Sequence, residues 1–454
     1  MRKIDKRQGL MLCAAGLLVV VMLTVFARLG TRQVLVKRAH MNNFITQTVL
    51  YGNDELQEHK KSEEENVKIE WEKAYPFADI DRVKKWEWLT AQKIEKKAEI
   101  VEKKIDEWTG KNLLGYYKLA EAGRGYATEI GWGLIRTDKD MLLPLGDGAW
   151  TFAYPRDKDA IQEKFVSLAD LAQTVAENDG QFLYIQAPFK VDPYGDFAVN
   201  GMIDFSNQNC DDLLGKLQAQ GIATLDLRQD LHRWAQAEHI SYHDYFFRTD
   251  HHWKPETALR AAKVVGNKLR EYDIPVDDSH YDLQAFAVEV LPQFFLGSQG
   301  KKATLARATP DDFSILHPRF PTKITLNIPE KNIHDTGDFE LVYDKKKVER
   351  CDYYGLNPYA MYGYGDMQVM DIENLLMPPT DKKVLIIKDS FCDTMAPLLS
   401  LGIRNLMTLD VRHFTGSVKN YIAVHKPDVV IVMYTGSLSG SIDWSSHKDK
   451  FDFR

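Results

Sequence analysis

The stretch VLIIKDSFCD at residues 384–393 is the part of the sequence that most strongly indicates the fold. It begins with four apolar residues, 384–387, three of which are β-branched, as is typical of a strand buried on both faces of a sheet. The residues that follow, 393–401, predict a helix. A buried strand that leads directly into a helix is the repeating unit of an α/β fold with parallel strands.

The same alternation of strand and helix continues on both sides of this stretch. The predicted strands are 182–185, 222–227, 384–387, 405–409 and 429–434, and the predicted helices are 164–177, 211–220, 255–272, 393–401 and 415–425. We therefore expect an α/β fold with a doubly wound, mostly parallel sheet. Residues of about 280–380 interrupt the pattern, because they are rich in Pro, Gly and Tyr and contain short β-like runs. We interpret them as a β-rich insertion or a covering subdomain.

The N-terminal region contains a candidate membrane anchor. Residues 9–27, GLMLCAAGLLVVVMLTVFA, carry no charge, and a helix of this length spans roughly 28 Å, about the thickness of a hydrocarbon core. A cleavable signal peptide is the alternative, but the apolar stretch is long for one and no small-x-small site follows it. We predict a cytoplasmic tail at 1–8, a transmembrane helix at 9–27 and the rest of the chain outside the cytoplasm.

Residues 28–110 are predicted to be a juxtamembrane segment followed by a long charged helix. Six apolar side chains recur at helical spacing and form one stripe, which ends near Gly110: Ala91, Ile94, Ala98, Val101, Ile105 and Trp108. The stripe could pack on the protein's own domain or form a short coiled coil or docking face for a partner. The remaining residues, 111–454, are predicted to form the α/β domain.

Composition excludes several functional classes. The 454 residues carry a net charge of −7, which argues against a nucleic-acid partner, because a phosphate-binding surface requires clustered cations. The four cysteines show no metal-binding spacing and no dense disulfide framework. We expect no metal and no cofactor.

Ser390 follows the buried strand directly and is a candidate nucleophile. A serine hydroxyl needs a histidine to accept its proton, and that histidine needs a carboxylate to orient it. The fragment Thr249-Asp250-His251-His252-Trp253 contains both groups. We predict that His252 is the base and Asp250 its partner, while His251 is structural or contributes to a substrate groove. The alternative for Ser390 is an ordinary helix cap.

Two other interpretations of the histidine-rich fragment remain open. A metal-dependent hydrolase could use its imidazoles and carboxylates, which lie close in sequence to His243 and Asp244, although no helical His-x-x-x-His pair is present. A non-catalytic envelope scaffold or glycan-binding module could retain a degenerate form of the fold. In that case the charged helix of residues 80–108 would be the functional part.

The blocks TDHHW at 249–253 and IIKDSF at 386–391 resemble the DHHW family, which is related to the SGNH-hydrolase-like proteins that O-acetylate exported polysaccharides. The resemblance extends over about residues 80–454. It implies an SGNH-hydrolase-like fold with rearranged motif order, because the Asp-x-His pair precedes the serine. Residue by residue, it implies that Ser390 is the acyl-carrying nucleophile, His252 the base and Asp250 its orienting group.

The resemblance also suggests residues that contact the substrate. The segment LDVR at 409–412 resembles a family block near the site, so Arg412 is a candidate substrate contact. Apart from the resemblance, His251 and Trp253 of the TDHHW block and Tyr434 at the end of the last strand are further candidates, because polar and aromatic side chains there could line a sugar groove. Two glycine-containing blocks, 296–300 and 362–366, are places where backbone amides could complete an oxyanion hole, since a clear Gly-x-Asn-Asp block is missing.

The function that these features imply is a membrane-anchored O-acetyltransferase or acetylesterase that acts outside the cytoplasm, at the extracellular or periplasmic side. Its substrate would be a cell-envelope or secreted polysaccharide. The resemblance further implies a membrane-bound acyltransferase partner that supplies acetyl groups across the membrane.

Overall fold

The computed structural model describes residues 135–435 and 449–454, apart from short gaps at 137–140, 155, 157, 196–197 and 200–201. The predicted membrane span at 9–27 and the predicted charged helix at 80–108 lie outside these residues. Within the described residues, no helix is both long and apolar enough to cross a membrane.

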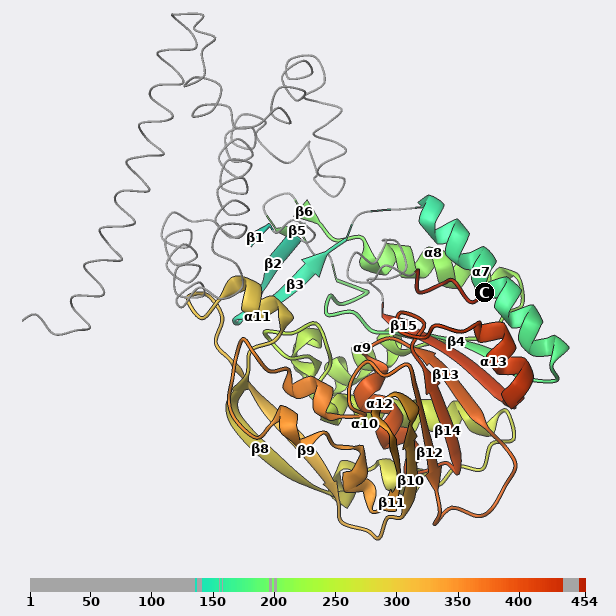
Figure 1. The fold of residues 1–454 in the computed structure, drawn as a ribbon. Coiled ribbons are helices and arrows are strands. Elements are labelled where there is room, and N and C mark those ends of the chain that lie inside the picture. Colours follow the sequence, from blue (N-terminus) through green and yellow to red (C-terminus); the bar gives the residue numbers. More distant parts are fainter. Residues whose placement is uncertain are drawn as a thin grey trace, which may run out of the picture. The chain divides into compact units, whose positions relative to one another are not determined.

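An eight-stranded mixed sheet forms the centre of the described structure (Figure 1). Its strand order is β11-β10-β12-β14-β13-β15-β4-β7, and the five strands from β14 to β7 are parallel. These five are β4 (Gln181–Ala187), β7 (Thr224–Asp226), β13 (Val384–Lys388), β14 (Asn405–Leu409) and β15 (Val429–Thr435). They match the five predicted strands to within a few residues, so the prediction of an α/β fold with parallel strands is confirmed.

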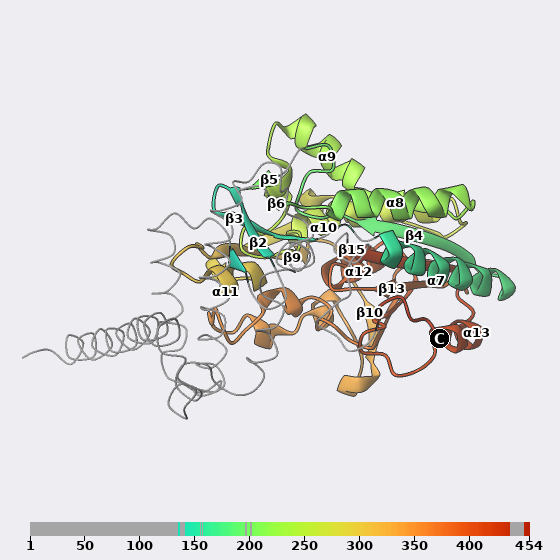
Figure 2. The ribbon, with the colours of Figure 1, turned by 90° about the horizontal axis from the view of Figure 1, so that it is seen from above.

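Helices cover both faces of the sheet, because alternate side chains of each central strand point to opposite sides. Leu385 and Ile387 of β13 pack in one core cluster with helices α7 (Lys158–Glu177), α8 (Ser206–Ala219) and α13 (Val418–His425). Figure 2 shows α7 and α8 side by side on this face. Val384 and Ile386 pack in the other cluster, with α9 (Leu227–Glu238), α10 (Pro255–Arg270) and α12 (Cys392–Ser400).

The segment of residues 280–380 is β-rich, as predicted, but it does more than cover the domain. Strands β10 (Ile324–Ile328), β11 (Ile333–Gly337) and β12 (Val369–Asn374) extend the central sheet beyond β14 in antiparallel pairing, which makes the sheet mixed. Strands β8 (Phe286–Phe295) and β9 (Asp311–Pro318) form a separate hairpin, and the short helix α11 (Ser298–Ala303) lies between them in the chain.

Two small sheets precede and follow α7. Strands β1 (Ile135–Arg136), β2 (Met141–Gly146) and β3 (Ala149–Ala153) form an antiparallel sheet, and β5 (Ala198–Val199) pairs with β6 (Met202–Ile203). The first of these sheets contributes Leu142, Trp150 and Phe152 to a third, smaller core cluster, which also contains Leu296 and Ala303 of the α11 region. This cluster places α11 against strand β3.

The carboxyl ends of the five parallel strands share one edge of the sheet, which is where open α/β sheets bind ligands. Ser390 follows β13 at this edge, and Arg412 follows β14. Thr435, the last residue of β15, donates its backbone N–H to the Asp389 carboxylate at 2.8 Å. Polar residues that follow separate strands in the sequence, such as Ser390 and Arg412, therefore lie at the same edge of the sheet.

Candidate active site

The turn that carries Ser390 is held from two sides. The Asp389 carboxylate accepts the N–H groups of Phe391, at 3.0 Å, and Thr435, at 2.8 Å, so that it ties the turn to strand β15. The Phe391 carbonyl accepts the indole N–H of Trp253 at 3.0 Å. Asp389 thus acts as a local cap, as its residue type suggests, while the serine hydroxyl is left for another partner.

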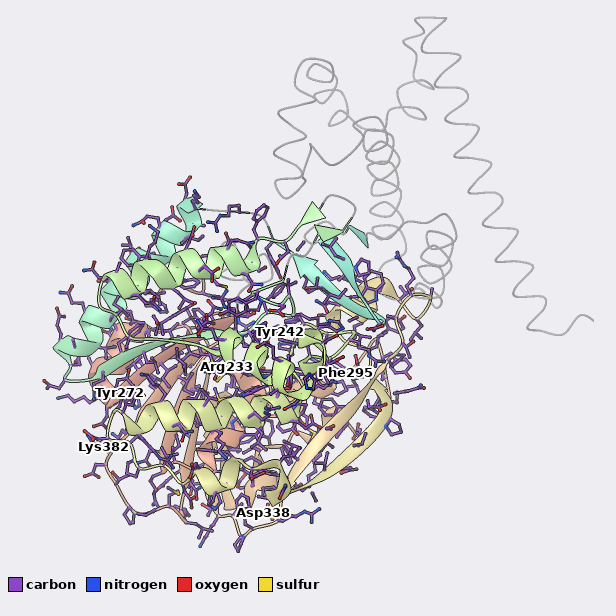
Figure 3. All side chains as sticks on the ribbon, turned by 180° about the vertical axis from the view of Figure 1, so that it is seen from behind. Arg233, Tyr242, Tyr272, Phe295, Asp338 and Lys382 are labelled. Atoms are coloured by element: carbon purple, nitrogen blue, oxygen red, sulfur yellow. The ribbon has the colours of Figure 1, made fainter. Side chains whose placement is uncertain are left out.

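The loop of residues 246–253 carries Asp250 and His252, the predicted carboxylate partner and the predicted base. Its two ends are joined by a β-bridge between Phe246 and Trp253, and the Phe247 N–H donates to the His252 carbonyl at 3.1 Å. Helix α10 begins directly after the loop, with Pro255 in its first turn. The Phe247 ring packs edge-on against Phe295, at 5.0 Å between centroids; Figure 3 labels Phe295. A loop closed and packed in this way holds its side chains in defined positions.

The structure brings Asp250, His252 and Ser390 into one hydrogen-bonded chain. His252 Nε2 lies 2.7 Å from Ser390 Oγ, and His252 Nδ1 lies 2.5 Å from Asp250 Oδ1. Because an ionised carboxylate can only accept, Nδ1 carries the proton and Nε2 is free to accept the serine hydroxyl. Asp250 and His252 are 3% and 5% exposed, so bulk water competes little for these bonds.

The electrostatic environment keeps Asp250 ionised. Burial alone would raise the pKa of its carboxyl, but His251 and His252, with hydrogen bonds from His252 and the Ser298 N–H, hold that pKa well below its usual range. The Ser298 N–H contacts Oδ2 at 2.6 Å. The carboxylate can therefore stabilise a positive charge on His252 without taking its proton.

His251 occupies a different position from His252, as adjacent residues must. Its Nδ1 lies 2.9 Å from Ser298 Oγ, and its ring lies against the His252 ring at 3.8 Å between centroids. Burial, followed by the charge of His252, lowers the pKa of His251 to about 3. Its side chain is 29% exposed, so a neutral imidazole forms part of the surface beside the site.

Two predicted substrate contacts are wrong. Trp253 and Tyr434 have no exposed surface, so neither can touch a substrate. Trp253 packs against the Phe391 ring and supports the serine turn, while the Tyr434 hydroxyl donates to the Lys450 carbonyl at 2.7 Å. Trp253 directly follows His252 in sequence, and Tyr434 lies at the end of the last strand, but both side chains are buried in the core.

Arg412 lies at the same edge of the sheet and is anchored by acidic groups. Its guanidinium donates to Asp410 through Nε, at 2.9 Å, and through Nη2, and it forms an ion pair with Asp366. Its side chain is 10% exposed. A second buried ion pair joins Lys388 to Asp393, which lie on either side of Ser390 in sequence. Arg412 stays a prediction as a substrate contact.

The same residues also bear on the predicted alternative of a metal site. Asp250, His251 and His252 form the one group among the described residues whose ligand atoms are close enough together to hold an ion. However, both ring nitrogens of His252 are already engaged, one by Asp250 and one by Ser390. A metal would have to break the acid–base pair or displace the serine, so these donors fit proton transfer better than metal coordination.

The two glycine-containing blocks have roles other than the predicted one. The Ser298 N–H is donated to Asp250, and the Gly297 N–H to the Thr249 hydroxyl at 2.9 Å. In the second block, the Gly363 and Gly365 amides donate to backbone carbonyls. The first block supports the carboxylate instead of an oxyanion. The Ser390 N–H is different: no acceptor for it is present among the described residues.

Sequence reasoning missed Tyr359 as a site residue. Its ring is stacked on the His252 ring at 4.0 Å between centroids, with 13° between the planes, and its hydroxyl donates to the Phe391 carbonyl at 3.3 Å. The cluster of tyrosines between 353 and 364 was a visible signal, but aromatic clusters indicate packing or sugar binding equally well. Nothing in the spacing identifies the one that lies on the base.

Part of the chain matches a known domain model, and its fold is similar to that of a solved structure. Residues 148–305 match the family model described as the SGNH hydrolase-like domain of the acetyltransferase AlgX. This segment contains Asp250 and His252 and ends before Ser390. No curated protein matches the chain by sequence.

Among solved structures, PatB1 of Bacillus cereus with a sulfonyl adduct shares 19% identity with this chain and gives a TM-score of 0.56. The alignment covers 70% of this chain and 100% of PatB1. A DHHW family protein from Eubacterium siraeum shares 17% identity, with 68% and 94% covered and a TM-score of 0.48. The O-acetyltransferase domain of AlgJ from Pseudomonas putida shares 13%, with 69% and 97% covered and a TM-score of 0.43. The predicted resemblance to SGNH-hydrolase-like acetyltransferases is confirmed for residues 148–305 by the domain-model match. The fold is similar to that of PatB1.

Proposed function

We propose that this protein is an O-acetyltransferase, or an acetylesterase, that acts on a cell-envelope or secreted polysaccharide through Ser390, His252 and Asp250. The observation that carries the proposal is the hydrogen-bonded chain from Asp250 through His252 to Ser390, with His252 Nε2 2.7 Å from Ser390 Oγ. The match of residues 148–305 to an acetyltransferase domain supports acetyl as the transferred group.

The first half of the reaction loads the serine. His252 Nε2 accepts the hydroxyl proton while Ser390 Oγ forms a bond to the carbonyl carbon of an acetyl ester. The imidazolium is stabilised by Asp250, to which its Nδ1–H donates. When the tetrahedral intermediate collapses, the ester C–O bond breaks and His252 returns the proton to the departing oxygen. The product is acetyl-Ser390.

The second half repeats these steps with another oxygen. A sugar hydroxyl gives its proton to His252 and attacks the acetyl carbon, and Ser390 leaves with a proton from His252. Water in place of the sugar yields acetate, so transferase and esterase differ only in the acceptor. The partly exposed imidazole of His251 lies beside this position and can contact the acceptor.

The negative charge that develops on the acetyl oxygen requires hydrogen-bond donors. The Ser390 N–H suits this task, because it has no acceptor among the described residues and belongs to the nucleophile itself. Each preorganised donor of this kind is typically worth about 3–4 kcal/mol of transition-state stabilisation. The amides of Phe391 and Cys392 are already bonded to Asp389 and do not contribute.

The proposed location is the outer side of a membrane, with residues 9–27 as the anchor. Their length and lack of charge support this placement. A membrane-bound acyltransferase that passes acetyl groups across the membrane would be the partner that supplies the donor. Fractionation tests the anchor: the full chain should stay with membranes in alkaline carbonate, and recovery in the supernatant would contradict it.

The catalytic proposal is tested by labelling with phenylmethylsulfonyl fluoride, because an activated serine displaces fluoride from sulfur and keeps the sulfonyl group. Full-length protein in detergent is treated with the reagent, and the modified residue is located by peptide mapping. Hydrolysis of 4-nitrophenyl acetate, and acetylation of an oligosaccharide panel, are measured on the same samples. We expect the adduct on Ser390 and turnover of the ester.

Ser390→Ala and Ser298→Ala form a matched pair, since both serines contact a histidine of the same loop. Ser390→Ala should abolish both labelling and turnover, while Ser298→Ala should retain both. Unlabelled wild-type protein without ester turnover would contradict the proposal and favour the scaffold. Activity that survives in Ser390→Ala and disappears with a chelator would instead favour a metal-dependent hydrolase.

A further inference from the structure

Asp311, the first residue of β9, contacts the catalytic loop just before Asp250. Its carboxylate accepts the N–H of Arg248 at 2.8 Å, the N–H of Thr249 at 2.8 Å and the hydroxyl of Thr249 at 2.6 Å. Asp311 is 8% exposed, and Thr249 is fully buried. Three short bonds from one buried carboxylate to two successive residues fix the backbone there.

The Thr249 side chain connects Asp311 to the Asp250 carboxylate through the start of α11. Its oxygen accepts the N–H of Gly297 at 2.9 Å, and the next amide, that of Ser298, donates to Asp250 Oδ2 at 2.6 Å. The Thr249 carbonyl also accepts the Gly300 N–H at 2.7 Å. The start of α11 is therefore hydrogen-bonded to both Thr249 and Asp250. Asp311 in turn binds Thr249.

Lys190 holds the opposite side of the same backbone. Its ammonium donates to the carbonyls of Arg248, at 3.2 Å, and Trp150, at 2.8 Å, and to Gln299 Oε1 at 2.7 Å. These three acceptors use all three of its protons. Asp311 therefore binds the N–H groups of Arg248 and Thr249, and Lys190 binds the carbonyl of Arg248. Neither residue touches Ser390, and the proposed reaction uses neither.

We propose that Asp311 is a positioning residue for the Ser390 site: through Thr249 and the first turn of α11, it fixes the place of Asp250 and thereby the orientation of His252. The inference rests on the proposed function, because it concerns the reactivity of the serine. Its physical basis is that catalysis depends on placement, and a shift of about 1 Å in a reacting group can cost roughly 100-fold in rate.

The test measures the reactivity of Ser390 directly. The rate constant and the final stoichiometry of labelling by phenylmethylsulfonyl fluoride are determined for the full chain in detergent. The stoichiometry gives the fraction of intact sites, and the rate gives the nucleophilicity of each intact site. Asp311→Asn, which keeps the shape but turns an NH₂ group toward N–H donors, should label fully but at least about tenfold more slowly. Its kcat on 4-nitrophenyl acetate should fall, with KM unchanged.

Asp204→Asn is the matched control. Asp204 is also buried, 5% exposed, and its carboxylate likewise accepts two backbone N–H groups, from Tyr154 and Ser206, and one hydroxyl, from Ser206. It makes no contact with the catalytic loop in the described residues. Asp204→Asn should still label at the wild-type rate, and urea unfolding of both variants measures how far each substitution changes stability.

Three results would overturn the inference. They are labelling of Asp311→Asn at the wild-type rate, equal slowing in Asp204→Asn, and wild-type reactivity of Thr249→Val, which removes only the connecting hydroxyl. The last variant decides the matter if Asp311→Asn does not fold. Wild-type protein that fails to label at all contradicts the proposed function instead, so the two failures are distinguishable.

Discussion

The rings of His252 and Tyr359 are stacked 4.0 Å apart at 13° from parallel, and both side chains are nearly excluded from solvent. The imidazole must keep one nitrogen on Asp250 and the other on Ser390, so its plane cannot rotate without breaking a bond. Tyr359 covers one face of that plane. Its hydroxyl also reaches the Phe391 carbonyl at 3.3 Å, which connects the base to the serine turn.

Two substitutions of Tyr359 should separate the contribution of its stacked ring from that of its hydroxyl. Tyr359→Leu removes the stacked ring, and because such aromatic contacts are worth about 0.5–1.5 kcal/mol, ester turnover should fall by up to roughly tenfold beyond any loss of folded protein. Tyr359→Phe keeps the stack and should stay within about threefold of wild type. The measurement is the rate of ester hydrolysis divided by the number of reactive sites, which labelling of a separate sample with phenylmethylsulfonyl fluoride counts. Equal losses in both variants would mean that the hydroxyl, and not the ring, supports the base.

The two adjacent histidines should differ strongly in their effect on activity. His252→Ala should lower kcat nearly as much as Ser390→Ala, by at least about 10³-fold, because the members of such a chain act as a unit. His251→Ala loses one hydrogen bond, to Ser298, and should cost less than about tenfold. Steady-state hydrolysis of 4-nitrophenyl acetate by the three variants tests this. If His251→Ala were the more damaging change, His252 would not be the base.

The core of the site could be predicted from the sequence because its parts are local. A buried apolar run ending in Asp389-Ser390 places a hydroxyl at the carboxyl edge of a parallel sheet, whatever the rest of the chain does. The spacing of Asp250 and His252 lets one loop hold both groups. Only the meeting of these two segments required the full fold, and the structure places them within 2.7 Å.

The errors concern features that depend on distant partners. Trp253 follows His252 and Tyr434 ends a strand at the same edge of the sheet, but both are buried. Whether a side chain faces the groove or the core depends on packing that no short segment specifies. Strands β10 to β12 extend the sheet because β12 pairs with β14, and a short alternating strand does not encode its partner. Tyr359 is a site residue only because η11 (Pro358–Met361) lies over the catalytic loop.

Gly297 should tolerate no side chain. A Cβ built there would lie 2.7 Å from the Asp250 Cα and closer still to its side chain, so even a methyl group must displace the carboxylate. We expect Gly297→Ala to reduce ester turnover by on the order of 100-fold. Overpacking at this position should also destabilise the fold by about 1–3 kcal/mol. Both quantities are measured on the full chain, by hydrolysis and by urea unfolding.

Gly215→Ala is the matched control for this change. Gly215 lies within helix α8, and a Cβ there would meet nothing within 4 Å. Alanine is the better helix former by up to about 1 kcal/mol, so this variant should be slightly more stable and fully active. Wild-type turnover in Gly297→Ala would show that Asp250 can move without consequence, contrary to its role in orienting His252.

Asp204 should impose a distinctive pH dependence on stability. Burial raises the pKa of its carboxyl to about 7, against the opposing effect of hydrogen bonds from Tyr154 and Ser206. In the unfolded chain such a group loses its proton near about pH 4. Between about pH 4 and 7 the folded protein therefore binds a proton that the unfolded chain has released, so this group makes the free energy of unfolding fall as the pH rises.

Asp204→Asn removes this contribution and leaves every other titrating group in place. Urea unfolding at about pH 5 and about pH 7 gives the change in free energy for wild type and variant, and the difference between the two changes isolates Asp204. We expect the wild type to lose up to about 3 kcal/mol more than the variant over this interval, from two pH units at about 1.4 kcal/mol each. Parallel pH profiles would mean that Asp204 is already ionised at the lower pH, held by its three hydrogen bonds.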